Sequence, residues 1–106
     1  MNHVLSTAAL AGAALLSAAP VLAQDAALLQ TRALAATCAN CHGTEGRAVD
    51  GAAVPGLAGL PAGYLQDQMK GFKAGTRTAT VMHQISKGYT DAQIERLAAY
   101  FAAAKK

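Results

Sequence analysis

Apolar residues recur at helical spacing in three stretches of the chain. These stretches run over Asp25–Thr37, over Tyr64–Lys73 and from Asp91 to about Ala104, and each would turn one apolar face toward a core. The candidate buried positions on these faces are Leu28, Leu29, Ala33, Leu34, Ala36, Leu65, Met69, Phe72, Ile94, Leu97, Ala98 and Phe101. No stretch alternates apolar and polar residues as a strand would. The pattern therefore predicts an all-α domain.

Glycine, proline and capping residues mark where these helices begin and end. Six glycines and two prolines fall within Gly43–Gly63, which predicts a long loop between the first two helices. Gly75 lies just past the end of the second helix. Arg77–Lys87 is expected to be a loop that could contain one turn of helix, stopped by Gly88. The sequence Thr90–Gln93 matches a capping box at the start of the last helix.

The N-terminal segment differs from the rest of the chain because it has no Lys, Arg, Asp or Glu before Asp25. Val4–Ala19 is rich in Ala and Leu, and Val21–Ala23 supplies the small or short apolar residues that signal peptidase reads. This pattern predicts a signal peptide over residues 1–23, cleaved after Ala23, although its positive region is weak. The alternative is an uncleaved membrane anchor, but the stretch is short and dominated by weakly hydrophobic Ala.

The predicted mature chain, residues 24–106, would form one small domain with a thin core. The whole sequence has 106 residues and is 53% apolar, yet it contains no Trp, two Phe and three Tyr. Domains this small often need a disulfide, a metal or a cofactor to complete the core. The net charge of +3 comes from scattered residues without interleaved aromatics, so nucleic-acid binding is not indicated. Export implies the periplasm, an oxidising compartment where free thiols do not persist.

One short motif, Cys38–His42, reads Cys-Ala-Asn-Cys-His and has the c-type haem attachment pattern. The thiols of Cys38 and Cys41 can add to the vinyl groups on one porphyrin edge, and their spacing of about one helical turn sets the sulfur separation. His42 can then bind the iron as proximal ligand. Its other ring nitrogen needs an acceptor, for which the carbonyl of Pro55 is our candidate. The motif predicts one covalent haem c.

Three other interpretations of the two cysteines fit less well. A thioredoxin-like disulfide would need a βαβ context, which the pattern lacks. A structural zinc site would need four ligands at recognised spacings, and the predicted mature chain offers only Cys38, Cys41, His42 and His83. An accidental match is disfavoured by the export signal, by the position at a helix end and by the thin core.

The second axial ligand is less constrained by the sequence. Met82 lies far enough beyond His42 for the chain to pass around the ring and present a thioether from the opposite face. Met69 shares a helical face with core candidates, where a methionine is more often part of the core. His83 would give bis-histidine ligation, and an open iron position is the last alternative. We favour Met82, and Met/His ligation would suit electron transfer rather than binding of small substrates.

Nearly all of the predicted mature chain resembles the small class I cytochromes c. The haem motif alone is generic, and Thr80–Tyr89 narrows the likeness to the haem subunit of flavocytochrome c sulfide dehydrogenase and related monohaem and dihaem bacterial cytochromes. The matching segments are Leu34–Gly46, Val54–Gly59, Tyr64–Lys73, Gly75–Arg77, Ala79–Asp91 and Leu97–Phe101. The resemblance implies three to four helices around one covalent haem, with the first and last helices crossing. It also implies Cys38 and Cys41 as attachments and His42 and Met82 as iron ligands.

The resemblance further implies a periplasmic one-electron carrier, not a complete enzyme. In its sharper form, the chain would be the haem subunit that takes electrons from the flavin of a sulfide dehydrogenase. A free-standing shuttle to a terminal oxidase or a photosynthetic reaction centre is the alternative, and a haem sensor or peroxidase-like enzyme is the third hypothesis. Arg77 is a candidate to hydrogen-bond a haem propionate. The residues expected to pack on the haem are Leu57, Leu60, Leu65, Phe72, Val81 and Ile85.

Overall fold

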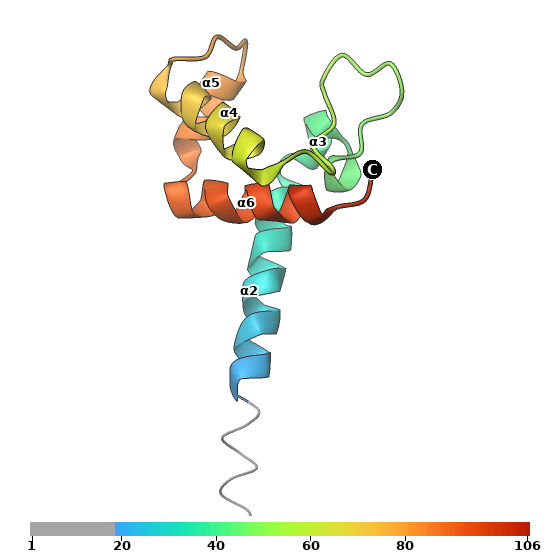
Figure 1. The fold of residues 1–106 in the computed structure, drawn as a ribbon, viewed down its shortest axis with the longest axis vertical. Coiled ribbons are helices and arrows are strands. Elements are labelled where there is room, and N and C mark those ends of the chain that lie inside the picture. Colours follow the sequence, from blue (N-terminus) through green and yellow to red (C-terminus); the bar gives the residue numbers. More distant parts are fainter. Residues whose placement is uncertain (1–18) are drawn as a thin grey trace, which may run out of the picture. The chain divides into compact units, whose positions relative to one another are not determined.

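The computed structural model describes residues 19–106, and within that range it contains helices and loops but no strand. The helices, shown in Figure 1, are α2 (Ala19–Ala36), α3 (Ala39–His42), α4 (Ala62–Ala74), α5 (Met82–Ile85) and α6 (Asp91–Ala103), with short 3-10 turns at Thr44–Gly46 and Ser86–Gly88. The all-α class predicted from the sequence is confirmed. None of the helices in this range combines the length and the hydropathy that crossing a membrane requires. Most of the predicted signal peptide, residues 1–18, lies outside the described residues.

The first helix differs from its prediction at both its start and its buried face. α2 begins at Ala19 rather than Asp25, because the intervening residues are mostly good helix formers. A compact unit of the chain begins only at Thr31, within α2. Leu28 and Leu29 precede that point and are 53% and 65% exposed. The prediction that these two leucines are buried was therefore wrong.

Inside the compact unit, the last turns of α2 bury a different face from the one expected. Ala35 is buried and Leu34 is half-buried, whereas Ala33 and Ala36 are exposed. Residues three and four apart share a helix face, so the buried stripe runs through Leu34 and Ala35 to the half-buried Cys38. The expected burial of Ala33 and Ala36 was wrong, and the stripe that is buried leads directly into the cysteine motif.

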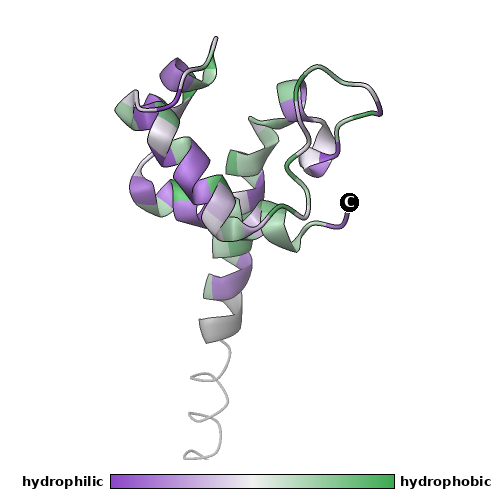
Figure 2. Cartoon of the chain, turned by 45° about the horizontal axis from the view of Figure 1, so that its top comes forward, coloured by the Kyte–Doolittle hydropathy of each residue, from purple (hydrophilic) through white to green (hydrophobic). Residues whose placement is uncertain are grey.

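The core of the compact unit lies between α4, α6 and the end of α2. The four predicted core positions of α6 are all buried, and purple and green residues interleave along the helices in Figure 2, as amphipathic helices require. Leu65 of α4 and Ala35 pack in the same cluster as Leu97, Ala98 and Phe101. α6 starts with the predicted capping box, in which the Thr90 hydroxyl accepts from the Gln93 amide and the Gln93 side chain accepts from the Thr90 amide.

The long loop between α3 and α4 is closed on itself at Gly46 and bonded to α6 at Gly59. The carbonyl of Gly46 accepts hydrogen bonds from the amides of Leu57 and Ala58 at 2.7 and 3.1 Å, and the amide of Gly59 donates to the carbonyl of Phe101 at 2.9 Å. Gly46 has φ +75°, and a Cβ there would lie 2.9 Å from Cδ1 of Phe101. A glycine is needed here for both reasons. The closure of this loop brings Pro55 back toward α3.

Candidate haem site

A cavity of about 440 Å³ opens into the compact unit between α3 with its following loop and the helices α4 and α5. Its volume falls in the range of about 300–1,000 Å³ typical of cofactor and small-ligand sites. The six residues expected to pack on a haem all line it. The thin core therefore has a large apolar hollow at its centre, and a flat apolar cofactor would fill it.

The cysteine motif forms one turn of helix at the edge of this cavity. The amides of Cys41 and His42 donate to the carbonyl of Cys38 at 3.3 and 3.0 Å, so the two cysteines lie on successive turns of the backbone. Both line the cavity, Cys38 half-buried and Cys41 exposed, and both are free thiols with no disulfide between them. This is the arrangement that attachment to one edge of a porphyrin requires.

The environment of the two thiols is unequal. Burial raises the pKa of the Cys38 thiol above its ordinary value of 9.0, an effect partly offset by the Thr37 hydroxyl and reinforced by the neighbouring Cys41. The Thr37 oxygen lies 3.9 Å from the Cys38 sulfur. The Cys38 thiol is therefore harder to deprotonate than an ordinary cysteine thiol.

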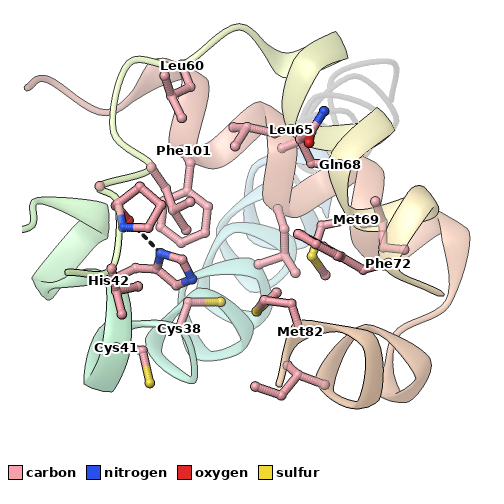
Figure 3. Close-up of a pocket in the computed structure, with 18 of the residues that line it drawn as sticks. Cys38, Cys41, His42, Leu60, Leu65, Gln68, Met69, Phe72, Met82 and Phe101 are labelled. Carbon is pink, nitrogen blue, oxygen red and sulfur yellow. Dashed lines mark hydrogen bonds between the residues drawn. The ribbon is translucent and has the colours of Figure 1, made fainter. Parts of the chain in front are cut away.

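The histidine of the motif has a defined tautomer. Nδ1 of His42 lies 2.6 Å from the carbonyl oxygen of Pro55, which is the acceptor expected from the sequence. A carbonyl can only accept, so Nδ1 carries the proton, and in the neutral ring Nε2 keeps its lone pair. Figure 3 shows this hydrogen bond on one side of the ring and the other ring nitrogen turned toward the cavity. Such an imidazole is ready to bind a metal ion from that side.

Two methionines line the opposite part of the cavity. Met82 is the first residue of α5 and Met69 belongs to α4. In Figure 3 the Met82 side chain extends toward His42 and Cys38, while Met69 lies beside Phe72. His83, the neighbour of Met82 in sequence, does not line the cavity. The structure thus brings both methionines, but not His83, into the cavity that His42 also lines.

One cation lies at the rim of the cavity. Arg77 lines it with its guanidinium 4.8 Å from the centre of the Phe72 ring, within cation–π distance. The Arg77 amide donates to the carbonyl of Gly71 at 3.2 Å. The turn that ends α4 therefore fixes the backbone of this arginine while its charge stays exposed.

Sequence reasoning missed one hydrogen bond next to the motif. The Tyr89 hydroxyl lies 2.7 Å from the Thr37 hydroxyl, which in turn donates to the carbonyl of Leu34 at 2.8 Å. The two residues are 52 positions apart in the chain, and no local pattern marks such a pair.

Residues 19–106 do not contain the cluster of ligands that a structural zinc site needs. Within that range no group of three or more His, Cys, Asp or Glu side chains lies close enough together to hold a metal ion. The donors that do meet are two thiols at one edge, one imidazole and two thioethers. This donor set fits a haem, which brings its own four nitrogen ligands and needs only axial groups from the protein.

The fold and this donor set are those of a class I c-type cytochrome. Residues 29–105 match the cytochrome c family, and the chain belongs to that family. It is accordingly an electron-transfer cytochrome with covalently bound haem c, and the Cys-Ala-Asn-Cys-His motif fits that attachment.

The names of several relatives refer to a sulfide dehydrogenase or a thiosulfate dehydrogenase. The chain is 40% identical over 68 residues to the cytochrome subunit of sulfide dehydrogenase from Chlorobaculum tepidum, covering 64% of this chain and 60% of that protein. It is 42% identical over 71 residues to the thiosulfate dehydrogenase electron acceptor of Thiomonas intermedia, covering 67% of this chain and 33% of that protein. Among solved structures, a cytochrome c4 of Acidithiobacillus ferrooxidans has 41% identity and a TM-score of 0.58, covering 62% of this chain and 37% of that one. The chain thus spans between a third and three fifths of these relatives.

Proposed function

We propose that this chain is a periplasmic monohaem cytochrome that takes single electrons from the flavin of a sulfide-oxidising flavoprotein. The observation that carries this proposal is the similarity to the cytochrome subunit of sulfide dehydrogenase, which extends over 60% of that subunit. The flavin and the sulfide chemistry would belong to the partner. The export signal over residues 1–23, cleaved after Ala23, supplies the periplasmic part of the proposal.

The residue roles in this proposal follow the geometry of the cavity. Cys38 and Cys41 form the two thioethers, His42 is the proximal iron ligand and Met82 the distal one. Support comes from the helical turn of the motif, from the free Nε2 of His42 and from the direction of the Met82 side chain. When bound, the haem supplies a one-electron couple at its iron. The Pro55 carbonyl orients His42.

The chain's own residues would favour electron exchange over substrate chemistry. Met82 and His42 together would leave no open iron position for a small substrate, which disfavours the sensor and peroxidase hypotheses. The apolar lining would keep water from the buried part of the ring. Cys41 is exposed at the rim, so the haem edge that it holds would be the place where electrons enter and leave. Arg77 is positioned at the rim to pair with a propionate.

A copurification experiment tests the partner. The full chain is matured with haem in a bacterial periplasm, together with the flavoprotein subunit of a sulfide dehydrogenase. We expect a stable 1:1 complex and reduction of the cytochrome when sulfide is added, and neither when the flavoprotein is omitted. A cytochrome that elutes alone and stays oxidised with the flavoprotein and sulfide present would contradict the proposal.

A free-standing electron acceptor is the second candidate function, in line with the shuttle alternative. It is favoured by the 42% identity to the thiosulfate dehydrogenase electron acceptor. The same purified cytochrome can be mixed with a thiosulfate dehydrogenase and thiosulfate. Rapid reduction without a stable complex would support this candidate over the subunit role.

A further inference from the structure

The segment that carries Met82 has few ties to the rest of the molecule. Apart from the Tyr89 amide, which donates to the carbonyl of Ser86 at 3.2 Å, no other part of residues 19–106 forms a hydrogen bond or ion pair with residues 78–88, although α5 and the following 3-10 turn pack against α4. Its turn is closed by local bonds, from the amides of Gln84 and Ile85 to the carbonyl of Val81. Two buried polar atoms in it, Nδ1 of His83 and Oγ of Ser86, have no partner within the described residues. Apart from this packing, the hydrogen bonds that fix the segment lie at its two ends.

At its start the segment is fixed by the turn that ends α4. The carbonyl of Gly71 accepts from the amides of Thr76 and Arg77 at 3.0 and 3.2 Å, and the Arg77 guanidinium lies over the Phe72 ring. These contacts are made to α4, the helix that immediately precedes the segment. They fix the direction in which the backbone leaves α4, but they do not join the segment to the cysteine motif.

At its end the segment is fixed by Tyr89, which bonds to two separate elements. The Tyr89 carbonyl accepts from Nζ of Lys73 on α4 at 2.8 Å. The Tyr89 hydroxyl lies 2.7 Å from Oγ1 of Thr37. Thr37 has one hydroxyl proton and donates it to the carbonyl of Leu34, so Tyr89 donates to Thr37. Since Thr37 directly precedes Cys38, this bond ties the end of the methionine segment to the attachment motif.

We propose that Tyr89 is a positioning residue for the axial methionine. The hydrogen bond from its hydroxyl to Thr37 holds the end of the Met82 segment, residues 78–88, beside the cysteine motif. This bond thereby sets how readily Met82 leaves the iron. Tyr89 lines the same cavity but acts through Met82. The proposal rests on the assignment of Met82 as distal ligand.

The opening of the Met82 segment can be measured with an external ligand. Imidazole can bind the ferric iron only where Met82 has left, so its apparent affinity is proportional to the fraction of open molecules. Removal of one hydrogen bond from the closed form shifts the equilibrium between closed and open molecules by the net free energy of that bond. This shift corresponds to a factor of about two to ten in the open fraction. We therefore expect the holoprotein with Tyr89→Phe to bind imidazole about two- to tenfold more tightly than the wild type.

A set of matched variants separates this role from general stability. Thr37→Val should increase the imidazole affinity at least as much as Tyr89→Phe, and Tyr89→Phe should add little to it in the double variant, because both variants remove the Thr37–Tyr89 bond and Thr37→Val also loses the local bond to the Leu34 carbonyl. Thr37→Ser keeps the hydroxyl and should behave as wild type. Tyr100→Phe is the control, since the Tyr100 hydroxyl has no hydrogen bond within the described residues and its ring packs on Phe101 outside the cavity. Thr37→Val also serves if Tyr89→Phe fails to mature.

The outcomes distinguish the positioning role from the ligand assignment. If Tyr89→Phe and Thr37→Val lower the melting temperature but leave the imidazole affinity unchanged, the positioning role is overturned and Met82 can still be the ligand. If the wild-type ferric protein lacks a methionine–iron charge-transfer band, or Met82→Ala leaves that band intact, the assignment of Met82 itself fails. An increase in imidazole affinity confined to the Tyr89 and Thr37 variants supports the proposal.

Discussion

The two sides of the cavity are held in opposite ways. On the attachment side, the loop after α3 is bonded to the core at Gly46 and Gly59, and it places the Pro55 carbonyl on His42. On the methionine side, residues 78–88 make only local hydrogen bonds, and Val81 and Ile85 are 55% and 43% exposed. The imidazole is oriented by the protein alone, whereas the thioether depends on two anchors at the ends of its segment. The iron bond from Met82 would therefore be easier to break than the iron bond from His42.

Loss of both thioethers should have the largest effect, because it removes the cofactor that fills the cavity. We expect Cys38→Ala/Cys41→Ala to abolish a stable fold, since the core without haem is too small for a domain of this size. Far-ultraviolet circular dichroism during heating measures this. Single variants that keep one thioether are the control and should retain cooperative unfolding. A helical double variant with a cooperative melt would contradict the expectation that haem completes the core.

Removal of Met82 should change the iron but spare the fold, because the attachment side stays intact. We expect Met82→Ala to lose the methionine–iron charge-transfer band and to have a lower reduction potential, since a thioether ligand raises the potential. Optical spectra in both redox states and a potentiometric titration measure these effects. Met69→Leu is the matched control, because Met69 lines the same cavity, and it should keep the band. The opposite result would make Met69 the distal ligand.

A methyl group at Gly46 should disturb the attachment side without touching the cofactor. In Gly46→Ala the new Cβ meets the Phe101 ring and the Leu57 Cβ within about 3.0 Å, so we expect a loss of roughly 1–3 kcal/mol from overpacking in addition to backbone strain. Gly51→Ala is the control, since its φ of +76° is nearly the same and nothing lies within 4 Å of its Cβ. Gly51→Ala should lose only about 1–2 kcal/mol of stability, the cost of backbone strain alone. Guanidinium chloride unfolding gives both values, and equal losses would show that Gly46 is not packed as described.

The smallest effect is expected at the ion pair beside Tyr89. The hydrogen bond from Lys73, together with its charge, lowers the pKa of the Asp91 carboxyl below its ordinary value of 3.8. A carboxyl with a lowered pKa in the folded state stabilises the protein above pH 3.8, and this contribution is lost as the pH falls through 3.8 and below. The pair is exposed, so the contribution is small.

Melting temperatures between pH 7 and pH 3 measure this contribution. Asp91→Asn should be slightly less stable than the wild type at pH 7, and the difference should shrink below pH 3.8. Asp67→Asn is the control, because Asp67 is exposed on α4 and forms no ion pair within the described residues. A difference for Asp91→Asn that persists at pH 3 would mean that the pair does not account for it.

Those parts of the molecule that depend on local pattern could be predicted from the sequence. The apolar face of α6, its capping box and the helical turn of the cysteine motif all follow from residues within a few positions of one another. The Pro55 carbonyl beside His42 was expected because the second ring nitrogen of such a histidine needs an acceptor, and the glycine- and proline-rich loop after the motif could supply one.

Features that depend on tertiary contacts were missed or wrong. The burial of Leu28 and Leu29 depends on where the compact unit begins, which helical periodicity does not reveal. The hydrogen bond between Thr37 and Tyr89 joins residues 52 positions apart, and no local sequence pattern indicates that two such distant residues meet. The need for glycine at position 46 arises from the Phe101 ring, which comes from the other end of the chain.

The hydrogen bond from His42 to Pro55 also bears on the speed of electron exchange. An electron crosses between proteins only when the surroundings of the iron suit both charge states, and each group that must rearrange raises the barrier. An imidazole already oriented by a backbone carbonyl at 2.6 Å has little left to rearrange, as preorganised polar groups in general do. With His42 bound to the iron, this side of the site would therefore contribute little to the reorganisation energy.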